Sequence, residues 1–132
     1  MDTSRAEERQ CETALAALRL HPCEETLWAC VVAFRGQRFK TMSGLPFSYE
    51  LKTGRRGGFT RELWIDRREG SKSLAWSSVL LAYRGIGSLG AVVDRPKALG
   101  DIRGVSYIYG IFCRFGLISA PEKARGKMMV EE

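Results

Sequence analysis

Residues 38–66 read RFKTMSGLPFSYELKTGRRGGFTRELWID, and their pattern sets the expected fold class. Polar and apolar side chains alternate along this stretch, which is typical of strands that bury one face. The alternation predicts three strands, over residues 38–42, 47–52 and 59–66. The connections SGLP and TGRRGG contain the glycines that tight turns need. We therefore expect a three-stranded antiparallel β-meander.

Two helices are expected on the N-terminal side of the meander. Apolar residues recur at helical spacing over residues 4–20, and glutamates stand in the early turns. Pro22 suits the first turn of a second helix, which Gly36 is expected to end. Two adjacent valines in this second segment leave a strand open as an alternative.

Two further helices are expected on the C-terminal side. Residues 73–84 have helical spacing and begin with a serine, which is a good N-cap. Asp101 is expected to cap a last, largely buried helix that ends before Gly116. Gly104 and Gly110 fall inside this helix, where each glycine costs about 1 kcal/mol relative to alanine. Such glycines suggest close packing against another element or a partner chain.

The elements together predict an α+β fold: a three-stranded antiparallel β-meander flanked by two N-terminal and two C-terminal helices. A chain of 132 residues has the size of one domain. We expect a single domain over residues 1–120, followed by a charged, frayed tail over residues 121–132. We expect no secretory signal in the polar N-terminal segment, and the longest apolar run is too short to cross a bilayer. We expect a cytoplasmic protein with no membrane partner.

Positive charge is concentrated in the middle of the chain. The net charge is +6, and residues 31–72 hold ten basic and four acidic residues, while residues 1–30 are acidic. A basic surface raises the local concentration of polyanions such as DNA or RNA. The turn GRRGG at residues 54–58 is the most basic of all. It is predicted to form the tip of a β-ribbon that can lie against a nucleic-acid groove.

The residues expected to contact nucleic acid lie in and beside this ribbon. They are Lys52, Arg55, Arg56, Arg61, Arg67, Arg68 and Lys72. The sequence therefore favours a small non-enzymatic binding module with DNA or RNA as its partner. A solvated basic surface without an anionic partner is the other interpretation of the same residues.

A protein-interaction module or homodimer is the main alternative function. Trp64 is expected to face away from Leu63 and Ile65, which leaves a large aromatic ring on the other side of the sheet. In this alternative Trp64, Gly104 and Gly110 form the contact, and the charge serves only solubility. The two functions differ in salt dependence, since phosphate contacts release counterions.

An enzyme is the third class of function, and the sequence argues against it. Glu50-Leu51-Lys52 matches half of a metal-dependent nuclease pattern, but no aspartate stands between Asp2 and Asp66 to complete it. The four cysteines and the single histidine lack the spacing of a zinc site. We expect reduced, mostly buried thiols, no metal and no cofactor.

Overall fold

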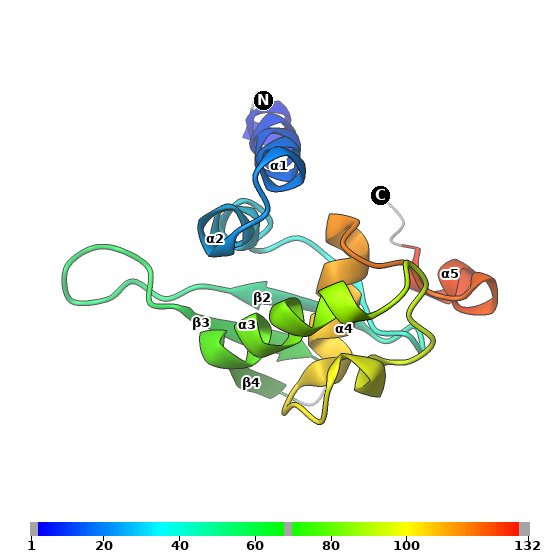
Figure 1. Ribbon diagram of the computed structural model, residues 1–132. Coiled ribbons are helices and arrows are strands. Elements are labelled where there is room, and N and C mark those ends of the chain that lie inside the picture. Colours follow the sequence, from blue (N-terminus) through cyan, green and yellow to red (C-terminus); the bar gives the residue numbers. More distant parts are fainter. Residues whose placement is uncertain (1–2, 68–69, 130–132) are drawn as a thin grey trace. The chain divides into compact units, whose positions relative to one another are not determined.

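The computed structural model describes residues 3–67 and 70–129. The chain forms two compact units, Met1–Arg35 and Gly36–Glu132. The first unit contains helices α1 (Thr3–Leu20) and α2 (Glu24–Ala33) (Figure 1). These helices confirm the two that the N-terminal sequence predicts, and they exclude the alternative strand. The extent of the predicted domain, residues 1–120, stays a prediction.

The helices of the first unit pack through small and aliphatic side chains. Cys11, Ala14 and Leu18, which share one face of α1, are buried. The buried residues of α2 are Leu27, Cys30, Val31 and Ala33. Sγ of Cys11 donates a hydrogen bond to the carbonyl oxygen of Ala33 at 3.3 Å. The apolar residues that recur at helical spacing in the sequence therefore form the contact between α1 and α2.

The second unit contains, within the described residues, a four-stranded antiparallel sheet in the order β1-β2-β3-β4. The strands are β1 (Phe39–Lys40), β2 (Pro46–Glu50), β3 (Glu62–Arg67) and β4 (Gly70–Ala75). The first three confirm the predicted meander, although each is shorter than expected or shifted. The fourth strand corrects the prediction, because the sequence places the start of a helix at residues 73–75.

The fourth strand is hard to recognise because its sequence, GSKSLA, contains one large apolar residue. Leu74 is buried opposite Leu63 on β3, while the serines at 71 and 73 are exposed on the other face. The predicted serine cap is therefore wrong. Ala75 precedes the helix instead, and α3 spans Trp76–Gly85. Strand pairing has overridden a favourable capping residue.

One face of the sheet forms the centre of the second unit. Its buried side chains are Phe39, Phe47, Tyr49, Leu63, Ile65 and Leu74. Helix α4 (Val105–Phe115) lies against this face, and a Cβ built on Gly110 would stand 2.5 Å from the carbonyl oxygen of Lys40. The absence of a side chain at Gly110 lets the helix approach β1 closely.

The chain between α3 and α4, and the two ends of α4, depart in part from the prediction. The connection from α3 to α4 contains two 3-10 helices, η1 (Ile86–Ser88) and η2 (Pro96–Leu99). The expected cap at Asp101 is wrong, because Gly104 precedes α4 with a left-handed φ of 79° that glycine adopts readily. Gly116 ends α4 as predicted.

Part of the predicted frayed tail is helical. Helix α5 spans Glu122–Met128, and its Ala124 is buried. Nε of Arg125 donates a hydrogen bond to the carbonyl oxygen of Ala120 at 2.9 Å, which ties α5 to the chain before it. Within the described residues, none of the helices combines the length and the apolar character that crossing a bilayer requires.

Candidate functional site

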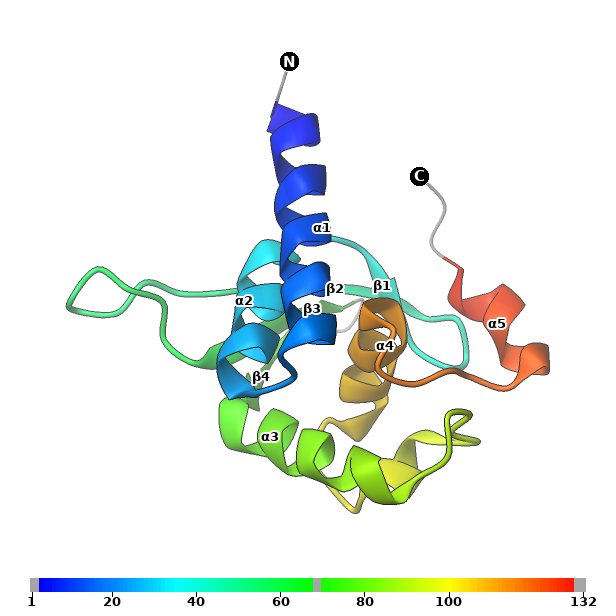
Figure 2. The same cartoon turned by 45° about the horizontal axis from the view of Figure 1, so that its top comes forward.

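Residues 51–61 form a basic arm between β2 and β3. Both views show this segment extending away from the sheet (Figures 1 and 2). It contains four basic residues and no carboxylate. All of its residues except Leu51 and Gly54 are exposed. The arm therefore presents positive charge from a projecting backbone rather than from a flat surface.

Hydrogen bonds define the tip of the arm as a tight turn. The Gly57 amide donates to the Gly54 carbonyl at 3.1 Å, and the Gly54 amide donates to the Gly58 carbonyl at 2.7 Å. Gly57 has a φ of 87°, the left-handed conformation that follows the turn in hairpins with a glycine bulge. Arg55 and Arg56 occupy the two central positions of this turn. Both side chains therefore start from the outermost point of the arm.

Aromatic rings mark the base of the arm. Nζ of Lys52 lies 3.6 Å from the centroid of the Trp64 ring, a cation–π contact. The guanidinium carbon of Arg61 lies 5.9 Å from the centroid of the Trp76 ring. Exposed Phe59 lies across the arm from Thr53, with which it forms a β-bridge. The arm therefore combines cations with an exposed aromatic side chain.

The structure separates the predicted nucleic-acid residues into two groups. The arm carries Lys52, Arg55, Arg56 and Arg61. The far end of β3 and the neighbouring strand carry Arg67 and Lys72, and Arg68 lies outside the described residues. Five residue steps along β3 separate Glu62 from Arg67, which is roughly 17 Å. The arm and Arg67 therefore lie at opposite ends of β3, whereas Lys72 pairs with Ile65 nearer the middle of the strand.

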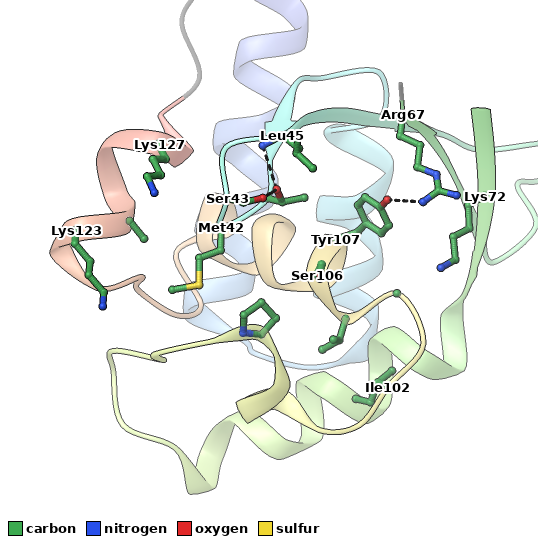
Figure 3. A pocket seen from close by; sticks show the side chains of 15 residues that line it. Met42, Ser43, Leu45, Arg67, Lys72, Ile102, Ser106, Tyr107, Lys123 and Lys127 are labelled. Carbon is green, nitrogen blue, oxygen red and sulfur yellow. Dashed lines mark hydrogen bonds between the residues drawn. The ribbon is translucent and has the colours of Figure 1, made fainter. Parts of the chain in front are cut away.

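Arg67 and Lys72 line a cavity of about 820 Å³. Both residues point to the buried face of the sheet, as the register Ile65 to Lys72 and Arg67 to Gly70 requires. Lys123 and Lys127 of α5 line the cavity from the opposite side (Figure 3). No described carboxylate lines it. We call these four residues the cavity cations.

One of the cavity cations is fixed by a neighbouring ring. Nη1 of Arg67 donates a hydrogen bond to the phenol oxygen of Tyr107 at 2.9 Å (Figure 3). Nε of Arg67 is buried, and none of the described residues accepts a hydrogen bond from it. The ring of Tyr107 packs edge-on against Phe47 at 5.1 Å. The guanidinium group is thus held in one orientation by Tyr107, while its Nε has no acceptor among the described residues.

The proposed interface residues have neighbours within their own unit. A Cβ on Gly104 would stand 2.7 Å from a methyl carbon of Leu74, and Gly110 is buried against Lys40 and Phe47. Close packing inside the chain therefore favours glycine at both positions, and Gly104 also has a left-handed φ of 79°. The role of both glycines in an interface stays a prediction. Trp64 faces away from Leu63 and Ile65 as predicted and is half-buried. Its role in an interface stays a prediction.

The cysteines differ in their surroundings. Burial raises the pKa of Cys113 to about 11 and that of Cys30 to about 11. Burial also raises the pKa of Tyr109, beside Cys113, to about 12. The pKa of exposed Cys23 is lowered by the hydroxyl of Thr26, which bonds to its side chain. No disulfide joins the four cysteines, and the described residues contain no group of three His, Cys, Asp or Glu side chains suited to a metal.

Sequence reasoning missed the two lysines of α5. The composition of the tail predicts fraying, although Lys123 and Lys127 are four residues apart and therefore share one face of a helix. Recognising that spacing would have placed both cations together, but not beside Arg67. Comparisons with protein-family models, curated proteins and solved structures yield no match to this chain.

Proposed function

We propose that this protein is a non-enzymatic module that binds nucleic acid through the basic arm. The observation that carries the proposal is the geometry of the tip, where Arg55 and Arg56 occupy the central positions of a projecting turn. Guanidinium groups bind phosphate oxygens through paired hydrogen bonds. A narrow projecting hairpin suits the approach to a phosphate backbone or a groove.

The charge of the arm supports the same proposal. No carboxylate stands among its four basic residues. Exposed Phe59, which is 39% accessible, offers a ring on which an unpaired base can stack. Cations combined with an aromatic side chain are typical of proteins that bind single-stranded nucleic acid. The proposal therefore includes single strands as well as duplexes.

Binding measurements with a matched control test the proposal. Fluorescently labelled mixed-sequence duplex and single-stranded DNA are titrated with the wild type, with Arg55→Ala/Arg56→Ala and with Arg84→Ala/Arg95→Ala. The control pair removes two exposed arginines outside the arm, so its net charge equals that of the test variant. If Arg55→Ala/Arg56→Ala loses binding and Arg84→Ala/Arg95→Ala keeps it, the result supports DNA binding through the arm. Equal loss in both variants would assign the effect to net charge alone.

The protein-interaction alternative predicts a different outcome. An apolar contact centred on Trp64 would respond little to salt and would not depend on the arginines of the tip. If wild-type protein binds neither DNA at low salt, the arm proposal fails. Sedimentation of the purified chain then tests the homodimer directly.

A further inference from the structure

The cavity of about 820 Å³ is a second, separate feature of the molecule. It lies at the end of β3 that is remote from the basic arm, between the sheet, α4 and α5. Its volume falls in the range of pockets that hold small molecules, which is roughly 300 to 1,000 Å³. The nucleic-acid proposal assigns no task to it.

Cations stand on two opposite walls of this cavity. Arg67 and Lys72 project from β3 and β4, and Lys123 and Lys127 project from α5 (Figure 3). No acidic side chain of the described residues lines the cavity beside them. Four positive charges around one space favour a ligand that carries several negative charges.

Arg67 is the residue best prepared to bind such a ligand. Its hydrogen bond to Tyr107 holds the guanidinium group in place, and its buried Nε has no acceptor among the described residues. A buried donor without a partner costs free energy, which a ligand oxygen would recover once the guanidinium group turned to present Nε to it. Phosphate and carboxylate oxygens both match the planar guanidinium fork.

Apolar side chains line part of the cavity between the cations, and they narrow the range of ligands further. Met42, Ile102 and the ring of Tyr107 lie between the two pairs of cations, together with Ser43 and Ser106 (Figure 3). Pro96 also lines the cavity. Inorganic phosphate would leave these side chains without a partner. A planar heterocycle attached to phosphates would cover them and still reach the cations.

We infer that the cavity binds a nucleotide, with its phosphates held by the cavity cations and its base against the apolar wall. The same chemistry is offered by a free nucleoside polyphosphate and by the phosphorylated end of a nucleic-acid strand. The site is independent of the basic arm, since none of the arm residues lines the cavity.

Titration with ATP that carries a fluorescent N-methylanthraniloyl group tests this inference. The wild type is expected to bind it, and Lys123→Ala/Lys127→Ala is expected to bind it roughly tenfold more weakly, because it removes two charged contacts. Both lysines are exposed, so the fold does not depend on their side chains. Arg67→Lys keeps the charge but loses the fork, and it too is expected to weaken binding. Arg84→Ala/Arg95→Ala serves as the control of equal charge.

Competition defines the ligand class. Unlabelled ATP and ADP are expected to displace the probe, whereas adenosine and citrate are expected to fail. If a 5′-phosphorylated oligonucleotide displaces the probe and its 5′-hydroxyl form does not, the site binds strand ends. If neither oligonucleotide displaces the probe, the site binds free nucleotides. Absence of binding, equal displacement by citrate, or unchanged affinity in Lys123→Ala/Lys127→Ala would overturn the inference.

A variant of the basic arm distinguishes nucleotide binding in the cavity from nucleic-acid binding by the arm. Arg55→Ala/Arg56→Ala is expected to bind the ATP probe as the wild type does, because both arginines lie outside the cavity. Loss of DNA binding with retained ATP binding in this variant supports two sites. Loss of both in this variant would contradict the independence of the cavity.

Discussion

Arg67 on β3 and Tyr107 on α4 are joined by a hydrogen bond of 2.9 Å between Nη1 and the phenol oxygen. The bond connects residues 40 positions apart in the sequence and lies in the wall of the cavity. It fixes one cation of the cavity while the ring of Tyr107 packs against Phe47. The same contact therefore supports the packing of the sheet on α4 and the orientation of a candidate ligand group.

Replacing this tyrosine separates the two roles. Tyr107→Phe keeps the ring that packs against Phe47 but removes the acceptor for Arg67. We expect the free energy of unfolding to fall by about 1 kcal/mol, the contribution of one such hydrogen bond. Urea unfolding measures the change. In Arg67→Ala the same tyrosine replacement should have a smaller effect, and an equal effect in both backgrounds would contradict the contact.

Gly110→Ala tests the close approach of α4 to β1. The added Cβ would stand 2.5 Å from the backbone oxygen of Lys40, which cannot move without shifting the strand. We expect a loss of roughly 1 to 3 kcal/mol in the free energy of unfolding, as for other overpacked cores. Gly126→Ala in α5 is the control, because nothing lies within 4 Å of its Cβ. Helix propensity should make that control neutral or slightly stabilising, and similar losses in both variants would refute the packing argument.

Alkaline pH is expected to destabilise the second unit through Cys113. Burial raises its pKa to about 11 from an ordinary value of 9.0, so the folded state retains a proton that the unfolded state loses. The stabilisation is complete below pH 9.0 and falls as the pH rises toward about 11. Unfolding midpoints across this window measure the loss. Cys113→Ala should lose less stability over the same window, and an unchanged pH dependence would exclude Cys113 as the cause.

We predict that Phe59 gives the arm a preference for unpaired strands. Phe59→Ala removes an exposed ring on which a base can stack. We expect the free energy of binding to single-stranded DNA to become less favourable by about 1 to 3 kcal/mol. Duplex affinity should change little, because paired bases are not available for stacking on the arm. Fluorescence anisotropy with both DNA forms checks the difference. An equal loss for the two forms would show that Phe59 acts by shaping the arm instead of by stacking.

Local sequence patterns predict the helices α1 and α2 and the β1 to β3 meander. Each of these has an apolar periodicity that can be recognised within one segment. The strand containing Leu74 is not predictable in this way because its remaining residues are small or polar, so that only pairing with β3 reveals it. The expected start of α4 is misplaced because a left-handed glycine at 104 takes the place of the expected cap.

The two candidate sites also differ in how far the sequence predicts them. A run of basic residues and glycines in one segment is enough to identify the tip of the arm. No such local run marks the cavity. Arg67 and Lys123 come together only through the packing of β3, α4 and α5, and no spacing along the chain encodes that arrangement.

The salt dependence of DNA binding shows whether the arginines of the tip contact phosphates. The logarithm of the association constant falls linearly with the logarithm of salt concentration, with a slope set by the number of phosphate contacts. We predict that Arg55→Ala/Arg56→Ala lowers that slope by about one unit for each arginine, relative to the wild type. Arg84→Ala/Arg95→Ala should leave the slope unchanged. A wild type that binds with no salt dependence, or a tip variant with the wild-type slope, would contradict the nucleic-acid function of the basic arm.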